Sequence, residues 1–329
     1  MSVLKASNDD YPTFQLNTPR FDQSTFKGRL RHFLDVTDPR TLFTSQAELE
    51  RSQELLKSFE RGTLDSTITN KQLWEAQKIK QAIIHPDTGE KIPMPFRMSG
   101  FVPFGAPIVT GLLLPNQGIA QIVFWQWLNQ SHNAAVNYCN RNASKKTPTS
   151  RFLLGYAGAV TSAVTIALSL SVLVKRANGL SPAVKLIVQK FVPFPAVATA
   201  SVSNVVLMRN SELSEGINVV DKNGRVIGVS KVAAKKALTE TALTRAFLPA
   251  PILVIPPIIM TALEKTKWLK RNPRMHLPCN ALAATLSFAF ALPIAIALFP
   301  QMSSIKREDL EADLQEECKD VCLYYNKGL

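Results

Sequence analysis

The polar side chains best suited to chemistry in this sequence form one uninterrupted run: Asn129, Gln130, Ser131, His132 and Asn133. Amide, hydroxyl and imidazole groups combine hydrogen-bond donors and acceptors without a fixed charge. Beside a bundle of helices, such a run would replace the hydration shell of a small polar solute. We therefore predict a substrate-binding site here and add Asn204, which lies inside another apolar stretch. The alternative is a helix end that emerges into water, where the same side chains are solvated.

Basic residues beside the apolar stretches form a second candidate group: Arg97, Lys190 and Arg209. These cations would attract an anion such as a carboxylate. The alternative is that they anchor helix ends, with aliphatic stems in lipid and charged heads in water. The apolar stretches themselves contain no Lys, Arg, Asp or Glu, which argues against a proton relay or a voltage sensor built on such residues.

A weaker pattern, His85, Asp87 and Glu90 in the sequence HPDTGE, contains groups that bind metal ions. A turn whose side chains satisfy the backbone explains the same residues, so we predict no metal and no other cofactor. The motifs G-x-S-x-G, G-x-G-x-x-G and H-E-x-x-H are absent, and we predict that the chain is not an enzyme. The net charge of +13 is not gathered on one surface, so we predict no nucleic-acid partner.

The distribution of charge predicts the elements that position these residues. Five stretches of 17 to 24 residues carry no charged side chain, although charged residues make up 19% of the chain. A charge at the centre of a bilayer costs about 2.5–3.5 kcal/mol on insertion scales. We therefore predict an all-α membrane protein whose five transmembrane helices, several of them interrupted by proline, occupy residues 99–115, 152–174, 191–208, 246–263 and 277–300.

Four further segments complete the predicted organisation. Residues 1–98 form a soluble headpiece with helices over 44–61 and 70–84, and residues 99–300 form the bundle. The bundle includes an amphipathic or re-entrant helix over 118–139 and an excursion over 209–245, which holds a small β-hairpin around Asn223-Gly224. Residues 301–329 form an acidic C-terminal tail.

The basic residues also predict an orientation. With five crossings, 23 Lys and Arg fall on the side of the headpiece and 15 on the other. The positive-inside rule then places the headpiece on the cytoplasm-like side, which is the matrix in a mitochondrion. The headpiece contributes 14 of the 23, and without it the tally is 9 against 15 and indicates the opposite orientation. The first ten residues include Asp9 and Asp10 and no Arg, so we expect no cleaved presequence.

Longer motifs carry a resemblance to a known family. The segments FDQSTFKGR (21–29), HPDTGEK (85–91), FWQWLNQSHNA (124–134), FVPFPAVA (191–198) and YNKGL (325–329) resemble the sideroflexins, also called the tricarboxylate-carrier family. The likeness extends over essentially the whole chain. The segments RFDQ, MPFRMSG and LLLPNQ are more similar to the branch linked to citrate than to the branch best known for serine.

The resemblance implies a multi-pass protein of the mitochondrial inner membrane that transports a small metabolite. Its partners would be the lipid bilayer and a small-molecule substrate, with no oligomeric state implied. From the charge-free spans we expect a serine-like amino acid, because a zwitterion needs fewer cations than citrate does. Citrate is the alternative. A membrane scaffold or assembly factor is a second alternative, and it would need no polar groups at membrane depth.

Overall fold

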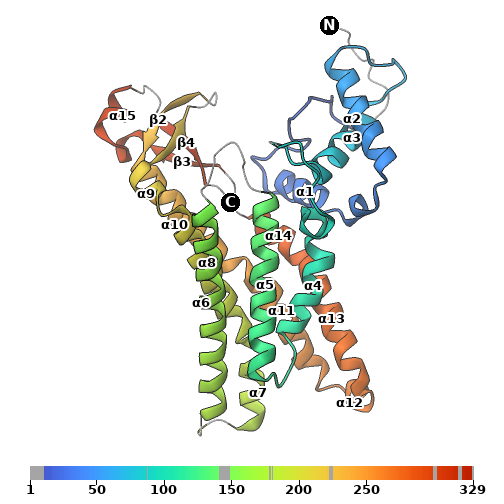
Figure 1. Cartoon of the computed structure of the whole chain (residues 1–329), viewed down its shortest axis with the longest axis vertical. Helices are drawn as coiled ribbons and strands as arrows, with labels where there is room; N and C mark the ends of the chain where they lie inside the picture. The colour runs from blue at the N-terminus through green and yellow to red at the C-terminus, as the bar shows by residue number, and fades with distance from the viewer. Residues whose placement is uncertain are drawn as a thin grey trace. The chain divides into compact units, whose positions relative to one another are not determined.

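The computed structural model describes residues 11–86, 88–140, 149–177, 179, 181–221, 225–298, 302–317 and 321–327 (Figure 1). The chain divides into two compact units. Unit 1 comprises the residues up to Gly105 together with 132–146, and unit 2 comprises 106–131 and 147–329. Helices α4 (Phe101–Leu112) and α5 (Ile119–Cys139) each contribute residues to both units.

Unit 1 contains the predicted headpiece. Its helices are α1 (Phe26–Val36), α2 (Gln46–Glu60) and α3 (Asn70–Ile83), joined by short 3-10 segments. The two predicted helices are confirmed as α2 and α3. At the start of α3 the side chains of Thr69 and Gln72 cap each other's backbone N–H, whereas at α2 the Ser45 hydroxyl accepts from the Glu48 N–H. A core of Phe14, Leu56, Leu73 and Trp74 holds the helices together.

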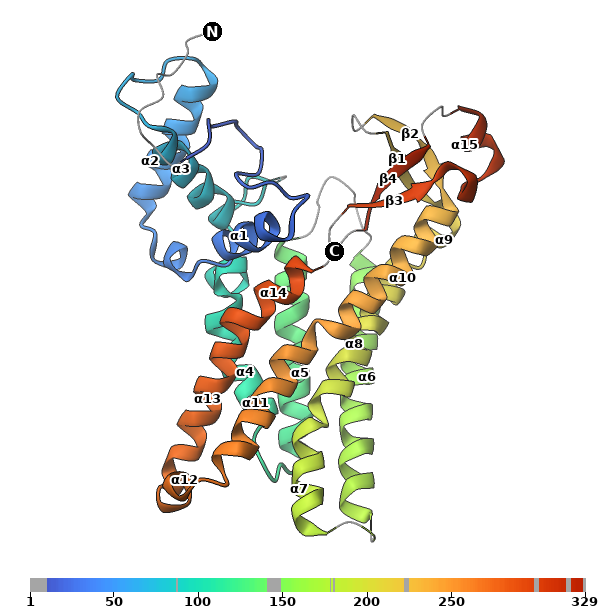
Figure 2. The same ribbon diagram turned by 180° about the vertical axis from the view of Figure 1, so that it is seen from behind.

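Unit 2 contains most of the predicted bundle. Its long helices are α6 (Thr149–Arg176), α7 (Pro182–Phe191), α8 (Pro193–Arg209), α10 (Lys231–Phe247), α11 (Pro249–Leu263), α13 (His276–Leu286) and α14 (Leu292–Ala297) (Figures 1 and 2). Among the described residues, three helical runs are long and apolar enough to cross a membrane: 152–176, 182–209 and 231–263. The apolar helix over 98–112 is shorter. The count of five spans is thus confirmed only in part.

Prolines interrupt these runs at some of the predicted places. Helix α7 ends at Phe191 and α8 begins at Pro193, and Leu248 separates α10 from α11. Pro256 and Pro257 cause no such interruption and lie inside the continuous helix α11. Between α13 and α14 the chain forms a π-helical segment, Ser287–Ala291. Each interruption leaves backbone groups that need partners other than the regular helical ones.

Small residues allow α6 and α8 to pack closely. Ala159 and Ala163 of α6 are buried against Ala200 of α8. Gly158 faces Leu207 so closely that an added Cβ would overlap the leucine side chain. Small residues at such positions are typical of helix pairs in membranes.

A four-stranded antiparallel sheet corrects the all-α prediction. Strands β1 (Ile217–Val220) and β2 (Val226–Ser230) form the predicted hairpin, whose turn lies outside the described residues. Strand β4 (Cys322–Asn326) pairs with β1 and with β3 (Met302–Lys306), giving the order β2-β1-β4-β3. The C-terminal tail therefore completes the excursion, because the core they share includes Val219, Leu323 and Tyr325.

The connection between α4 and α5 is packed tightly within unit 2. The Gln117 amide donates to the carbonyl oxygens of Gly111 (3.2 Å), Leu112 (2.8 Å) and Leu114 (3.0 Å) at and just after the end of α4, and the Gly111 carbonyl also accepts from the Leu114 N–H. Asn116 adopts a left-handed conformation (φ 56°) that turns the chain back. On the helix side, Gly111 lies against the Trp125 indole, with no room for a Cβ.

Replacing Gly111 with Ala should destabilise unit 2. The rigid indole of Trp125 would have to move, and overpacking of this kind costs about 1–3 kcal/mol. In the same connection Gly118→Ala is the matched control, since its new Cβ would make only an ordinary contact, 3.9 Å from Gln121. We expect a lower unfolding temperature in detergent for Gly111→Ala alone. Equal melting of the two variants would contradict the packing described.

Candidate functional site

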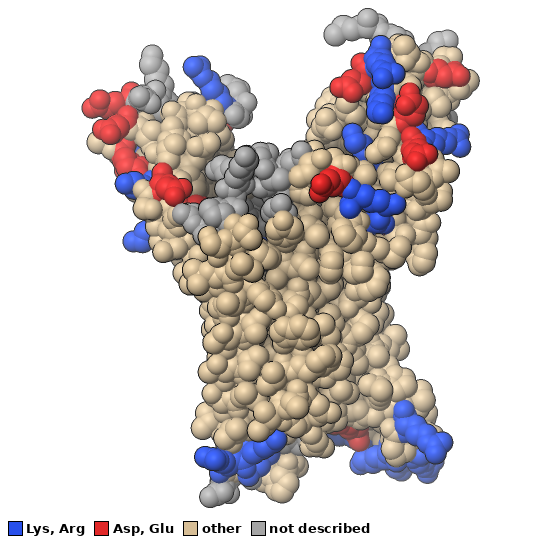
Figure 3. All heavy atoms as spheres, in the orientation of Figure 1, with Lys and Arg blue, Asp and Glu red and all other residues tan. Residues whose placement is uncertain are grey.

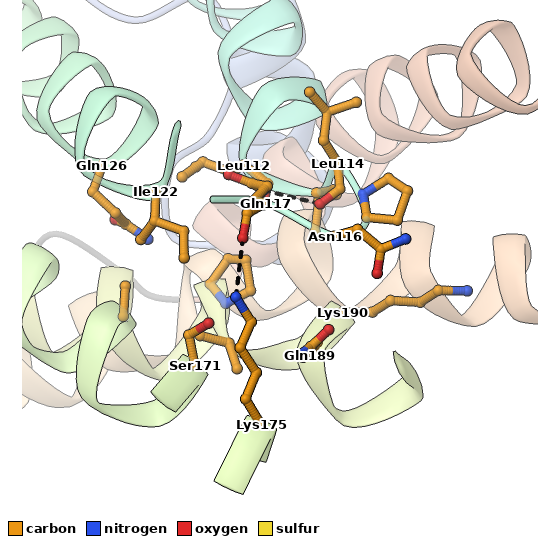
Figure 4. A pocket seen from close by; sticks show the side chains of 15 residues that line it. Leu112, Leu114, Asn116, Gln117, Ile122, Gln126, Ser171, Lys175, Gln189 and Lys190 are labelled. Atoms are coloured by element: carbon orange, nitrogen blue, oxygen red, sulfur yellow. Dashed lines mark hydrogen bonds between the residues drawn. The ribbon is translucent and has the colours of Figure 1, made fainter. Parts of the chain in front are cut away.

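A small polar cavity lies within unit 2 where α7 meets α8 (Figure 4). Its volume is about 50 Å³, enough for a few water molecules. Its walls come from the α4–α5 connection, α5, α6 and the α7–α8 junction. The polar lining side chains are Asn116, Gln117, Gln126, Ser171, Lys175, Gln189 and Lys190.

The α7–α8 junction brings irregular backbone to this cavity. The Val192 N–H bonds to the Gln189 carbonyl, which tightens the end of α7, and no side chain caps the start of α8. Pro193 and Pro195 have no N–H, so the first turn of α8 offers few donors. Broken helices that line a cavity present backbone polar groups at membrane depth.

Gln126 is the most deeply buried polar side chain at the cavity, with 2% of its surface exposed. Its Oε1 atom has no hydrogen-bond partner among the described residues. An unpaired buried amide oxygen costs about 1–3 kcal/mol, which a bound donor would recover. Asn129 and Gln130 follow at helical spacings of three and four, and their amide nitrogens are likewise buried without partners in the described part of the chain.

The structure divides the predicted run Asn129–Asn133 between the two units. Asn129 and Gln130 belong to unit 2 and share a face with Gln126. Ser131, also in unit 2, is bonded to the Trp127 carbonyl and to the Tyr156 hydroxyl, both at 2.8 Å. Ser131 contacts Tyr156 near the start of α6, whereas Gln126, earlier in α5, shares the cavity with Ser171 near the end of α6. Helix α5 therefore runs antiparallel to α6.

The remaining predicted site residues lie away from the cavity. His132 and Asn133 belong to unit 1, where His132 Nε2 lies 3.3 Å from the Pro95 carbonyl oxygen and the ring stacks on Phe101. Asn204 is half-buried on α8 beside Gly155 of α6, at the seam of small residues. None of these three residues lines the cavity.

The predicted cations also separate. Lys190 lines the cavity and forms a 2.6 Å ion pair with Glu264, whose other oxygen lies 2.7 Å from His276 Nε2. Burial raises the pKa of Glu264, but the hydrogen bonds from Lys190 and His276 outweigh burial and hold this pKa below its ordinary value. Lys190 is thus a neutralised cation. Lys175 instead donates to the Gln117 carbonyl oxygen (3.4 Å) and forms no ion pair among the described residues (Figure 4).

Arg209 and Arg97 have structural partners elsewhere. Arg209 ends α8 far from the cavity, where it pairs with Glu212 at 2.7 Å and donates to the Lys327 carbonyl oxygen. Arg97, in unit 1, is buried and donates to the Ile92 carbonyl oxygen at 2.9 Å. Of the three predicted cations, only Lys190 reaches the cavity.

The weak metal pattern has the geometry of a turn. The His85 ring nitrogen accepts from the Thr88 N–H at 3.3 Å, and the His85 N–H donates to the Glu90 carbonyl oxygen at 2.9 Å. Asp87 lies outside the described residues. Within the described part, no group of three His, Cys, Asp or Glu side chains is placed to hold a metal ion.

Sequence reasoning missed Gln126, Ser171 and Lys175. Gln126 precedes Gln130 by one helical turn, and from that spacing its position on the same helix face could have been predicted. Ser171 and Lys175 are likewise one turn apart on α6, but nothing in their own segment indicates that the α4–α5 connection folds against them.

Comparison with known proteins agrees with the resemblance drawn from the motifs. The family described as Sideroflexins matches residues 15–329. The chain is 59% identical to Sideroflexin-5 of Homo sapiens over 320 residues, which cover 97% of this chain and 94% of the human one. Identity is 55% to Sideroflexin-5 of Caenorhabditis elegans, covering 97% and 96% of the two chains, and 41% to Sideroflexin-1 of Ovis aries, covering 97% and 98%. No solved structure matches. The chain belongs to the sideroflexin family.

Proposed function

We propose that this protein transports a small polar metabolite through unit 2, with the cavity at the α7–α8 junction as part of the binding site. Sideroflexins are mitochondrial transporters rather than enzymes, and the apolar helical runs suit a membrane protein. The observation that carries the proposal is Gln126, a fully buried amide that lines the cavity with an unpartnered oxygen. A scaffold protein that binds no substrate would gain no stability from a buried amide oxygen without a hydrogen bond.

A serine-like amino acid is the substrate that the lining favours. Its ammonium group can donate to Gln126 Oε1, and its carboxylate can accept from Lys175, which has no ion-pair partner in the described residues. The Ser171 hydroxyl at the cavity can accept or donate. The cavity is smaller than the substrate, so binding requires the α4–α5 connection or the α7–α8 junction to move.

Citrate is the second candidate, supported by the motifs shared with the citrate-linked branch. It carries close to three negative charges, and unpaired buried charges cost several kcal/mol each. Lys175 supplies one charge that no described acid neutralises, while Lys190 is already paired with Glu264. Citrate would need the Lys190–Glu264 pair to open or further cations to enter with it, whereas a zwitterion needs neither.

Changing Gln126 to Ala should lower serine uptake into proteoliposomes. Loss of a hydrogen bond to a charged group costs about 1.5–3 kcal/mol, which corresponds to roughly 10- to 100-fold weaker uptake at low substrate concentration. Asn137→Ala, at an exposed position of the same helix, is the matched control and should leave uptake unchanged. Normal serine uptake by well-folded Gln126→Ala would remove this residue from the site. Absence of uptake of any metabolite by the wild-type protein would favour the scaffold alternative.

Changing Lys175 to Gln should separate the two substrates. We expect serine and alanine uptake by the wild-type protein to exceed citrate uptake, and Lys175→Gln to weaken uptake of both amino acids because the carboxylate loses its cation. Lys235→Gln, exposed on α10, changes the net charge equally and should have no effect. Side-by-side uptake of the three labelled compounds tests this. Strong citrate uptake that is equal in the wild-type protein and Lys175→Gln, without amino-acid uptake, would refute the amino-acid assignment.

We further propose that the protein resides in the mitochondrial inner membrane, with residues 1–98 facing the matrix. The support is the 14 Lys and Arg of the headpiece itself, since basic residues are retained on the matrix side. A tag placed in the headpiece should be protected from protease in intact mitoplasts and digested once they are lysed. Digestion in intact mitoplasts, where a matrix marker stays protected, would reverse the orientation.

A further inference from the structure

The segment between α11 and α13 presents an unusually dense group of cations. Lys265, Lys267, Lys270, Arg271 and Arg274 fall within ten residues and are all exposed. None of them forms an ion pair among the described residues, in contrast to Lys190 and Arg209. We refer to these five side chains as the basic patch. Figure 3 shows Lys and Arg gathered at the end of the unit 2 helices where α12 (Lys267–Arg271) lies.

The segment that carries the patch is ordered. The Thr266 hydroxyl accepts from the Leu269 N–H at the start of α12, and Leu269 is buried. Asn272 ends the helix by donating from its side chain to the Trp268 carbonyl oxygen at 3.0 Å. With Leu269 turned inward, the basic side chains of α12 face outward from a fixed helix. Binding of a ligand to these side chains therefore costs less conformational entropy than binding to a disordered segment would.

The one acidic residue beside the patch does not neutralise it. Glu264 precedes Lys265, but its two oxygens are held by Lys190 and His276. The sequence contains no further Asp or Glu until Glu308. The patch therefore keeps its positive charge and attracts an anion.

Exposed apolar side chains lie among the cations. Trp268 is 50% exposed within α12, and Leu277 is 54% exposed at the start of α13. Tryptophan next to basic residues is the composition of segments that lie at the headgroup level of a bilayer. A soluble anion would use the charges alone, whereas a phospholipid uses both the charges and the apolar surface.

We propose that the basic patch with Trp268 is a binding site for the headgroup of an anionic phospholipid. The phosphate is held by cations of α12, and Trp268 lies beside the upper acyl chains. The charge complementarity and the flanking apolar side chains select this occupant. The site is independent of the cavity at the α7–α8 junction, so it stands whatever substrate is transported.

The test compares lipids added to the detergent-purified full chain. Phosphatidylglycerol should raise its unfolding temperature and stay bound in native mass spectrometry, whereas phosphatidylcholine should do neither. Replacing Lys267, Lys270 and Arg271 together with Gln should weaken phosphatidylglycerol binding roughly 100-fold, since each basic residue near an anionic surface contributes about a fivefold effect. The control variant carries the same loss of charge in the headpiece, with Gln at three exposed positions: Lys27, Arg51 and Lys57.

Two further measurements keep the proposal falsifiable if the triple variant folds poorly. With the wild-type protein, raising the salt from 0.05 M to 0.5 M should remove most of the phosphatidylglycerol effect, because exposed charges are screened. Inorganic phosphate should not reproduce the stabilisation, and Trp268→Ala should weaken lipid binding. Equal stabilisation by inorganic phosphate would indicate a free-anion site and overturn the proposal. Equal phosphatidylglycerol binding by the triple variant and the control would overturn it as well.

Discussion

Backbone polar groups inside a bundle of apolar helices must find partners within the protein, and the rest of unit 2 is organised around the places where helices stop. At the end of α4, the Gln117 amide donates to three carbonyl oxygens of the chain that leaves the helix. At the α7–α8 junction, Pro193 and Pro195 remove donors, and no side chain caps α8. These two irregular segments meet at the same cavity. Polar side chains on α5 and α6 complete it, and Gln126 remains without a partner there.

The sequence predicted the helical bundle in part, with three of the five spans found in the described residues, because charge segregation follows burial in lipid. Helices α2 and α3 could also be predicted, because the residues that cap each helix lie within a few positions of its start. The sheet was only half predicted. The hairpin of β1 and β2 has a local turn, but β4 pairs with β1 across about a hundred residues of chain. Leu323 and Tyr325 alternate with more exposed residues, yet a five-residue strand in a charged tail gives too short a pattern to identify alone.

The candidate site illustrates the same limit. The run Asn129–Asn133 was recognised by composition, but a helix places successive side chains about 100° apart, so five consecutive residues cannot share one face. The buried amides instead follow the spacing of Gln126, Asn129 and Gln130. The sequence did not indicate which groups the predicted cations bind. Lys190 is neutralised by Glu264, 74 residues away, and Arg209 binds a carbonyl 118 residues away.

The two ends of unit 2 use charge in opposite ways. At the sheet, charged side chains pair with one another. Arg209 pairs with Glu212, and Lys327 pairs with Glu240 at 3.2 Å. The Lys327 carbonyl oxygen also accepts hydrogen bonds from Arg209 and Thr241. Such a network fixes the ends of α8 and α10 to the C-terminal strand. At the other end, Glu264 is held by Lys190 and His276, and the basic patch stays exposed. Movement around the α7–α8 junction therefore meets a rigid anchor on one side. On the other, the described cations of the basic patch have no ion-pair partners, so internal ion pairs tie down the sheet end of unit 2 but not the basic patch.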